Sequence, residues 1–185
     1  MSRKICISVI GSGNSNGGLS PEIAKIANDV GREIALRGAV LICGGLGGVM
    51  TEAAKGAKEK GGLTIGIIPG ENADNANPYI DVPIPTGLGF ARNVLVAYSG
   101  DAIIAVSGRL GTLSEISFAL IRKKPVIGIY TWELNQLTSQ QRQPGQTIQT
   151  DPLNMEDYER SIIKCRNARE AIEKAFSLIK IRKHF

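Results

Sequence analysis

The residues whose types and spacing could do chemistry lie first in the segment SGRLGTLSE, residues 107–115. It follows an apolar run at 101–106 and precedes apolar residues spaced three and four apart, so its glycines stand where a strand turns into a helix. Unpaired N–H groups at a helix start, together with the positive end of the helix dipole, attract anions and phosphate above all. Gly108 and Gly111 would let the backbone approach such a ligand without a Cβ in the way.

Three more glycine-bearing turns follow apolar runs, at 11–13, 44–48 and 69–70. The turn at 44–48 could cradle a phosphate or close-pack a helix start, and phosphate is favoured because the neighbouring turns offer the same chemistry. Neither the dinucleotide fingerprint nor a GxxxxGK[ST] loop is present, so no standard NAD site or ATPase P-loop is indicated. The residues expected to contact the ligand are Gly11, Ser12, Gly13, Gly44, Gly45, Gly47, Gly48, Asn93, Gly108, Arg109, Gly111 and Thr112.

Two charged residues, Arg92 and Glu115, are the candidates for catalysis, and each has a structural alternative. The stretch from Thr112 to Glu115 matches a capping box, in which the glutamate bonds back to the start of its helix. Arg92 could be a surface arginine, or it could bind phosphate through paired hydrogen bonds. Arg109 could either clamp an anion or fill the site. His184 is the one histidine, and no catalytic triad can be built around it.

Strands that alternate with helices must position these residues. Strands are expected at 4–10, 39–43, 63–68, 79–84, 101–106, 125–130 and 161–165, and helices at 21–37, 49–60, 88–99, 112–123 and from 167. This alternation predicts a mainly parallel α/β sheet with right-handed crossovers. In such sheets ligands bind beyond the carboxyl ends of the strands, near the point where the strand order reverses. All four glycine-bearing turns lie at those ends, which favours one shared site.

The composition is that of an ordinary globular protein, with 43% hydrophobic residues and a net charge of +5. The length of 185 residues suits a single domain, 1–185, with a long glutamine-rich connection at 132–158. The three cysteines form no CxxC pair, so we expect reduced thiols in a cytoplasmic protein and no metal site. The mild basic balance fits an anionic small molecule, and nucleic acid is disfavoured because no recognition motif is visible. No signal peptide or membrane span is indicated.

Three segments of the chain are together similar to a known family. CGGLGGVM at 43–50, GFARN at 89–93 and GRLGTLSE at 108–115 resemble the LOG superfamily, whose members are often labelled as lysine decarboxylases. GIIPG at 66–70 and TGLGFARN at 86–93 look like the branch that contains the molybdenum-cofactor carrier proteins. The resemblance spans residues 4–130. It implies a Rossmann-like, doubly wound sheet with helices on both faces, self-association, and a phosphorylated ligand beside the glycine turns.

In the LOG enzymes the motif is PGGxGTxxE, and its glutamate, with an upstream arginine, cleaves the N-glycosidic bond of a nucleoside 5′-monophosphate. The resemblance assigns these roles to Glu115 and Arg92. This chain departs from the motif, because Ser107 replaces the proline and Arg109 replaces the second glycine. Arg109 adds charge and bulk where the substrate lies, which argues against hydrolysis. No pyridoxal-phosphate lysine motif is identifiable, so decarboxylase chemistry has no support.

We therefore predict a binding protein for a phosphorylated small ligand, either a nucleotide or a molybdopterin-type cofactor. The alternative is a phosphoribohydrolase that uses Arg92 and Glu115. A third hypothesis, single-stranded nucleic-acid binding, follows from a distant kinship to DNA-processing proteins of the same superfamily. A homodimer or larger assembly is expected by resemblance, and the apolar helix around Val94, Leu95 and Tyr98 is its candidate interface.

Overall fold

The computed structural model describes residues 3–13, 18–133 and 162–182, and in them seven strands form one sheet in the order β4-β3-β2-β1-β5-β6-β7. The strands are β1 (Cys6–Gly11), β2 (Val40–Cys43), β3 (Thr64–Ile68), β4 (Val82–Pro85), β5 (Ala102–Val106), β6 (Val126–Ile129) and β7 (Ile162–Lys164). Every neighbouring pair is parallel. The chain builds outward from β1 to β4 and then returns to the other side of β1, so the strand order reverses between β1 and β5.

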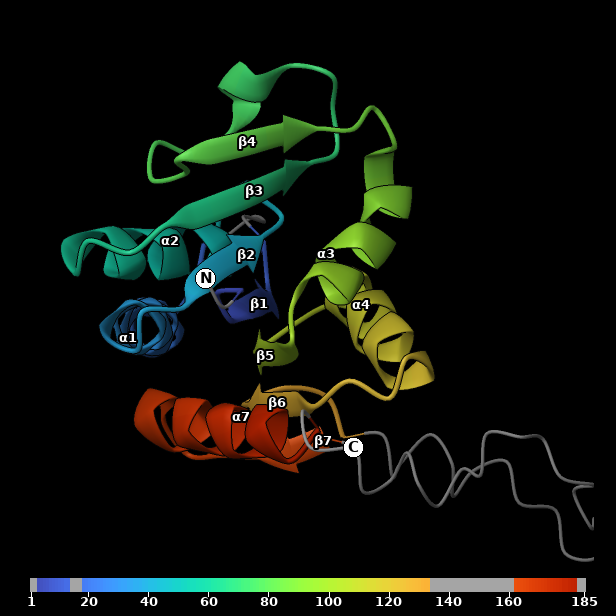
Figure 1. The fold of residues 1–185 in the computed structure, drawn as a ribbon. Helices are drawn as coiled ribbons and strands as arrows, with labels where there is room; N and C mark the ends of the chain where they lie inside the picture. Colours follow the sequence, from blue (N-terminus) through green and yellow to red (C-terminus); the bar gives the residue numbers. More distant parts are fainter. Residues whose placement is uncertain (1–2, 14–17, 134–161, 183–185) are drawn as a thin grey trace, which may run out of the picture.

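Five described α-helices cover the two faces of this sheet (Figure 1). One layer holds α1 (Pro21–Leu36), α2 (Val49–Glu59) and α7 (Ala168–Arg182). The opposite layer holds α3 (Asn93–Ser99) and α4 (Leu110–Ile121), and two 3-10 turns, η1 (Ala73–Asn75) and η2 (Gly89–Arg92), lie in the connections. The predicted doubly wound, Rossmann-like α/β fold is confirmed.

The central strands are buried on both faces, which is why they appear in the sequence as nearly continuous apolar runs. In β5, Ile104 and Val106 pack under α1, α2 and α7, whereas Ile103 and Ala105 pack under α3 and α4. Each face therefore has its own hydrophobic core, and the sheet separates the two. A shift of one residue in strand register would exchange these two sets of side chains.

Small residues bring α1 and α2 together in the first layer. A Cβ at Gly31 would overlap the carbonyl of Ala53, and one at Gly56 would overlap the carbonyl of Asn28. Ala53 and Ala57 of α2 are fully buried there. The opposite layer is tied to the sheet by a polar contact, since the buried Ser8 hydroxyl donates to the carbonyl of Val96 in α3 at 2.6 Å.

Most helix ends agree with the sequence signals. Ser20 caps α1 by accepting from the Ile23 N–H at 3.3 Å, Gly38 follows the helix at a φ of 68°, and Asn167 caps α7. Three expectations were wrong in detail. The helix expected at 88–99 begins as the 3-10 turn η2, the helix expected at 112–123 begins at Leu110, and the strand expected at 79–84 starts only at Val82. Residues 134–158 of the predicted connection, and His184, lie outside the described residues.

Two prolines protect one edge of the sheet. The Thr86 N–H bonds to the Ile68 carbonyl of β3, and alternate residues of a strand direct their N–H groups to opposite sides. Pro83 and Pro85 therefore stand where an N–H would point away from β3. Because proline carries no N–H, this edge cannot donate to an added strand. Pro83 and Pro85 thus lie in β4, the edge strand of the sheet.

Replacing both prolines, as Pro83→Val/Pro85→Val, is expected to restore two outward N–H groups on an edge where Val82 and Ile84 are already exposed. We expect static light scattering to show larger species at 37 °C in the variant. The control is Val82→Ile, which alters the same strand without adding a donor. Equal scattering from both variants would show that the prolines do not protect the edge.

Candidate functional site

A cleft of about 350 Å³ opens at the carboxyl ends of β1, β2 and β5, where the strand order reverses. It is lined by Val9, Ile10, Gly11, Gly13, Gly44, Leu46, Met50, Phe90, Arg92, Asn93, Arg109, Gly111, Thr112 and Glu115. The structure thus brings three of the four glycine-bearing turns, and both candidate catalytic residues, to one hollow. The fourth turn, at 69–70, is not in the lining. Its carbonyls instead accept the N–H groups of Gly87 and Gly89, which holds the segment that leads to Arg92.

Arg92 and Glu115 face each other at the floor of the cleft. Arg92 ends η2, Glu115 lies in the second turn of α4, and their Nη1 and Oε1 atoms are 3.6 Å apart. Each residue is only 7% exposed, so the surface-arginine alternative was wrong. The capping alternative for Glu115 was also wrong, because α4 begins at Leu110 and Thr112 accepts from the Arg109 N–H at 3.4 Å.

Burial governs the electrostatics of this pair. It raises the pKa of Glu115 to about 7, and the attraction of Arg92 opposes that rise only in part. Burial likewise lowers the pKa of Arg92, which nevertheless keeps its charge because an arginine pKa starts so high. In the part of the chain that the structure describes, the Nε atom of Arg92 is the one buried side-chain nitrogen or oxygen without a hydrogen-bond partner. An unsatisfied buried donor beside an open cleft is what a bound anion would satisfy.

The position of Arg92 depends on Gly44, the first residue of the turn at 44–48. A Cβ at Gly44 would lie 2.5 Å from Nη2 of Arg92, so the guanidinium occupies the space that a side chain would fill. Below it lies Cys43, whose thiol accepts from the Gly45 N–H at 3.4 Å and has its pKa raised by burial to about 11. That thiol is therefore neutral and forms part of the packed floor.

The variant Gly44→Ala should displace the guanidinium rather than unfold the chain, because the atom in the way is the end of a side chain. We expect at least a tenfold loss of affinity for a phosphorylated ligand, with a fall of about 1–3 kcal/mol in the free energy of unfolding. Isothermal calorimetry and urea denaturation measure the two effects. The matched control is Gly70→Ala, whose Cβ would lie at an ordinary 3.7 Å from Asn75. Unchanged affinity in Gly44→Ala would contradict the dependence of the site on Arg92.

Gly45 and Gly48 in the turn at 44–48 serve packing. Gly45 and Gly48 have φ values of 71° and 72°, and a Cβ there would overlap Ile68 and the Ser12 carbonyl, respectively. The Val49 N–H at the start of α2 already donates to that same carbonyl at 2.9 Å. Of the two roles considered for this turn, close packing of a helix start therefore applies to Gly45 and Gly48. Gly45, Gly47 and Gly48 do not line the cleft, and neither does Ser12, whose hydroxyl lies 3.2 Å from the hydroxyl of Ser107.

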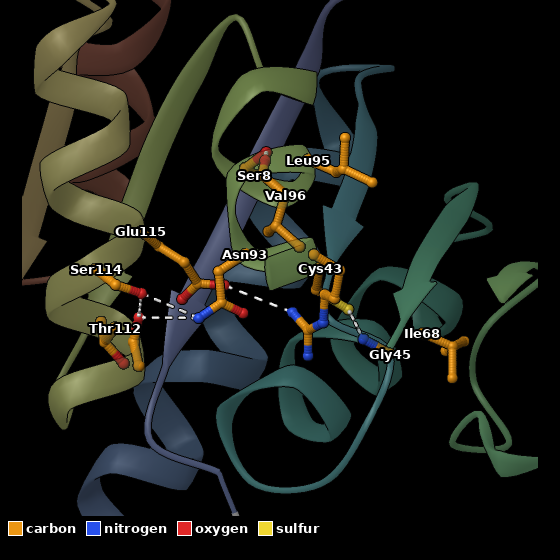
Figure 2. Close-up of polar contacts among 12 residues, drawn as sticks. Ser8, Cys43, Gly45, Ile68, Asn93, Leu95, Val96, Thr112, Ser114 and Glu115 are labelled. Carbon is orange, nitrogen blue, oxygen red and sulfur yellow. Dashed lines mark hydrogen bonds and ion pairs between the residues drawn. The ribbon is translucent and has the colours of Figure 1, made fainter. Parts of the chain in front are cut away.

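The start of α4 forms one wall of the cleft. Its first N–H groups, including those of Gly111 and Thr112, have no acceptor within the helix and carry the positive end of its dipole. Asn93 fixes this wall, since its Nδ2 atom donates to the Ser114 hydroxyl at 3.0 Å and to the Gly111 carbonyl at 3.4 Å. Figure 2 shows Asn93 facing Ser114 and Glu115 across the two elements. This arrangement is suited to holding a phosphate.

Arg109 lies at the rim and is exposed, so it does not fill the site. Among the described residues no carboxylate forms an ion pair with its guanidinium. Arg109 also borders a second hollow, an apolar groove of about 990 Å³ between η2 and α4. The groove is lined by Phe90, Ala91, Asn93, Gly108, Arg109, Leu110, Gly111, Ser114, Phe118 and Trp132. The sequence analysis did not identify the aromatic residues of this groove. Phe90 alone belongs to a motif singled out there, GFARN, in which it stands two residues before Arg92.

Solved structures share this fold over nearly the whole chain. The molybdenum cofactor binding protein from Rippkaea orientalis is 35% identical, with a TM-score of 0.80 over 97% of this chain and 99% of that one. The molybdenum cofactor carrier protein from Chlamydomonas reinhardtii is 32% identical, with a TM-score of 0.78 over 96% and 99%. No described helix is both long and apolar enough to cross a membrane.

An enzyme is also similar in sequence. The cytokinin riboside 5′-monophosphate phosphoribohydrolase of Mycobacterium tuberculosis is 32% identical over 124 residues, which is 60% of this chain and 64% of the enzyme. The chain thus spans less than two thirds of that protein. Residues 4–157 match the SLOG cluster4 family, which confirms the resemblance indicated by the motifs. The chain belongs to the SLOG cluster4 family.

Proposed function

We propose that this protein binds a phosphorylated small ligand, of the nucleotide or molybdopterin type, and holds it without cleaving it. The observation that carries the proposal is the unsatisfied Nε of Arg92, buried at the floor of a glycine-lined cleft. Arg92 lies at the floor of that cleft and the start of α4 forms one wall, so donors face the space from two sides. The similarity to two molybdenum-cofactor-binding proteins supports the same ligand class.

The residues present fit the phosphate end of such a ligand. The N–H groups of Gly111 and Thr112 would bind phosphate oxygens, the Arg92 guanidinium would donate from below, and Arg109 would add a positive charge at the rim. Gly11, Gly13 and Gly44 line the cleft without side chains of their own, beside Leu46 and Met50. A molybdopterin-type group would supply this phosphate and would travel as cargo, so this chain's own task would be to hold it.

Hydrolysis of a nucleoside 5′-monophosphate is the second candidate, favoured by the pairing of Arg92 with Glu115. A carboxyl group with a pKa of about 7 can accept a proton from water at neutral pH, and its anion can stabilise an oxocarbenium-like centre. Arg109 stands against this chemistry, because a long charged side chain replaces a motif glycine at the rim of the cleft.

We also propose self-association through α3. Leu95 is 38% exposed, whereas Val94 and Tyr98 are half-buried and the Tyr98 ring already packs under the Arg122 guanidinium at 4.7 Å. Leu95 is therefore the residue of the predicted interface that remains open to a partner. Light scattering at micromolar concentration tests this, and a monomer would contradict it.

A thermal-shift screen with nucleoside monophosphates and phosphorylated pterins, followed by chromatography of each mixture, tests the main proposal. A ligand at about 100 times its dissociation constant should stabilise the fold by about 2.7 kcal/mol. A shift with the ligand intact supports a binding protein, and released base supports hydrolysis. The absence of a shift with every compound would contradict both.

The variant Glu115→Gln distinguishes ligand binding without cleavage from hydrolysis of a nucleoside 5′-monophosphate. It removes a negative charge beside the anion site and keeps the shape of the side chain, so we expect ligand binding equal to or tighter than that of the wild type. Any release of free base should fall at least 100-fold, because the amide cannot accept the proton. Base release that survives in Glu115→Gln would show that this carboxyl is not the catalytic group.

A further inference from the structure

The apolar groove beside the cleft is unusual for a protein surface, because large apolar side chains stand open on it. Phe90 is 88% exposed and Leu110 is 76% exposed, and both border the groove. Exposed apolar patches of this kind commonly mark a binding site. The question is which apolar group the groove accommodates.

The two hollows are adjacent, because they share four lining residues. Phe90, Asn93, Arg109 and Gly111 line both the 350 Å³ cleft and the 990 Å³ groove. Their shared wall is the start of α4 and the end of η2, the same elements that present the phosphate donors. A ligand whose phosphate lies in the cleft therefore has its remaining atoms directed past Arg109, where the wall turns from polar to apolar.

The far wall of the groove consists of aromatic rings held in place. The Trp132 Nε1 atom donates to the Arg109 carbonyl at 3.4 Å, which fixes the indole next to the start of α4. The Phe118 ring meets the Tyr98 ring edge-on, with centroids 6.4 Å apart. Aromatic walls favour a flat, weakly hydrated ring, because offset and edge-to-face contacts add to the burial of apolar area. The guanidinium of Arg109 at the junction can also stack on such a ring.

We propose that this groove is the subsite for a planar heteroaromatic ring, of the nucleobase or pterin class, carried by the same ligand whose phosphate occupies the cleft. The inference rests on the proposed function, since it places the second part of that ligand. The site then has two parts. Positive charge and the helix dipole select the phosphate, whereas Phe90, Phe118 and Trp132 select the ring.

Trp132 is the sole tryptophan of the chain, so tryptophan fluorescence reports on a residue that lines the groove. Ribose 5-phosphate, which has no aromatic ring, is titrated against the four ribonucleoside 5′-monophosphates and a phosphorylated pterin, which are the ring-bearing probes. We expect at least one ring-bearing probe to bind ten or more times more tightly than ribose 5-phosphate and to quench Trp132. Ribose 5-phosphate should stabilise the protein in a thermal shift and leave the fluorescence unchanged.

The variant Ala91→Phe fills the groove from an exposed position in η2. We expect the ratio of affinities, ring-bearing probe over ribose 5-phosphate, to fall at least tenfold. The matched control is Leu36→Phe, which adds an exposed phenylalanine to α1 on the opposite face of the sheet and should keep the ratio (Figure 1).

Each remaining outcome overturns a specific statement. An unchanged ratio in Ala91→Phe, or no ring-bearing probe tighter than ribose 5-phosphate, removes the ring subsite and leaves the phosphate site standing. An unchanged ratio together with an altered mass by light scattering assigns the groove to a second copy of the chain and also removes it. Failure of every phosphorylated probe to bind removes the proposed function itself.

Discussion

Replacing Arg92 with alanine should weaken the binding of a phosphorylated ligand about 10- to 100-fold. A hydrogen bond to a charged group contributes about 1.5–3 kcal/mol, and each 1.4 kcal/mol is about tenfold in affinity. Arg92 is buried, its Nε has no partner in the described part of the chain, and it faces the cleft, so little of this energy is lost to water. Calorimetry with the best nucleoside monophosphate or pterin phosphate measures the loss.

Two further variants separate the charge of Arg92 from its geometry and from stability. Arg92→Lys keeps the charge but loses the planar fork, so we expect most of the affinity to be lost there as well. Arg92→Ala/Glu115→Gln removes both buried charges and should fold at least as stably as Arg92→Ala, which leaves Glu115 without its partner. An Arg92→Ala protein that is folded by circular dichroism and binds as the wild type does would exclude Arg92 from the site.

The second large effect is a fall in stability with rising pH that originates from Glu115. Burial raises its pKa from 4.5 to about 7 in the folded state, so between these values the folded protein holds a proton that the unfolded chain has released. The stabilisation is complete below pH 4.5 and is lost as the pH rises through 7. A shift of this size corresponds to about 3 kcal/mol in the free energy of unfolding.

Urea denaturation from pH 4.5 to 8 isolates this effect when the wild type is compared with Glu115→Gln, because every other group titrates in both proteins. We expect the wild type to lose about 3 kcal/mol relative to the variant across that range. The control Glu59→Gln changes a side chain that is 39% exposed and should follow the wild-type curve. Parallel curves for the wild type and Glu115→Gln would show that the pKa of Glu115 is not raised.

Ligand binding connects the two predictions. A phosphate bound near Arg92 adds negative charge beside Glu115 and should raise the pKa of this carboxyl further. Binding should then take up a proton near neutral pH, which calorimetry in buffers of different ionisation enthalpy would detect. A binding protein tolerates this proton, whereas a hydrolase needs the ionised carboxylate as a base.

Local signals were sufficient for much of the fold. The apolar runs at β1, β2, β3, β5 and β6 were visible because these strands are buried on both faces, and the alternation with helices implied parallel pairing. Helix starts such as Ser20 were visible because a cap is made within three residues. Parallel strands end at one edge, so the amino-acid sequence was enough to place three of the four glycine-bearing turns at one cleft.

The start of α4 shows where local signals fail. The stretch from Thr112 to Glu115 has the spacing of a capping box, yet the helix begins at Leu110, and Thr112 accepts from the Arg109 N–H instead. Because Leu110 and Gly111 are already helical, Glu115 lies in the second turn of α4 and not at its third position, and its carboxyl faces Arg92. The difference depends on how the turn after β5 packs, and residues near in sequence do not specify that.

The sequence by itself determined the succession of strands and helices along the chain, the edge of the sheet that carries the site, and the family. These follow from periodicity and from short motifs. Only the tertiary structure decided which glycine makes room for Arg92 and which ones pack, since that depends on the atoms facing each missing Cβ. It also decided the pairing of Arg92 with Glu115 and the groove formed by Phe90, Phe118 and Trp132. These residues come from separate elements, and their proximity exists only after the sheet has brought the elements together.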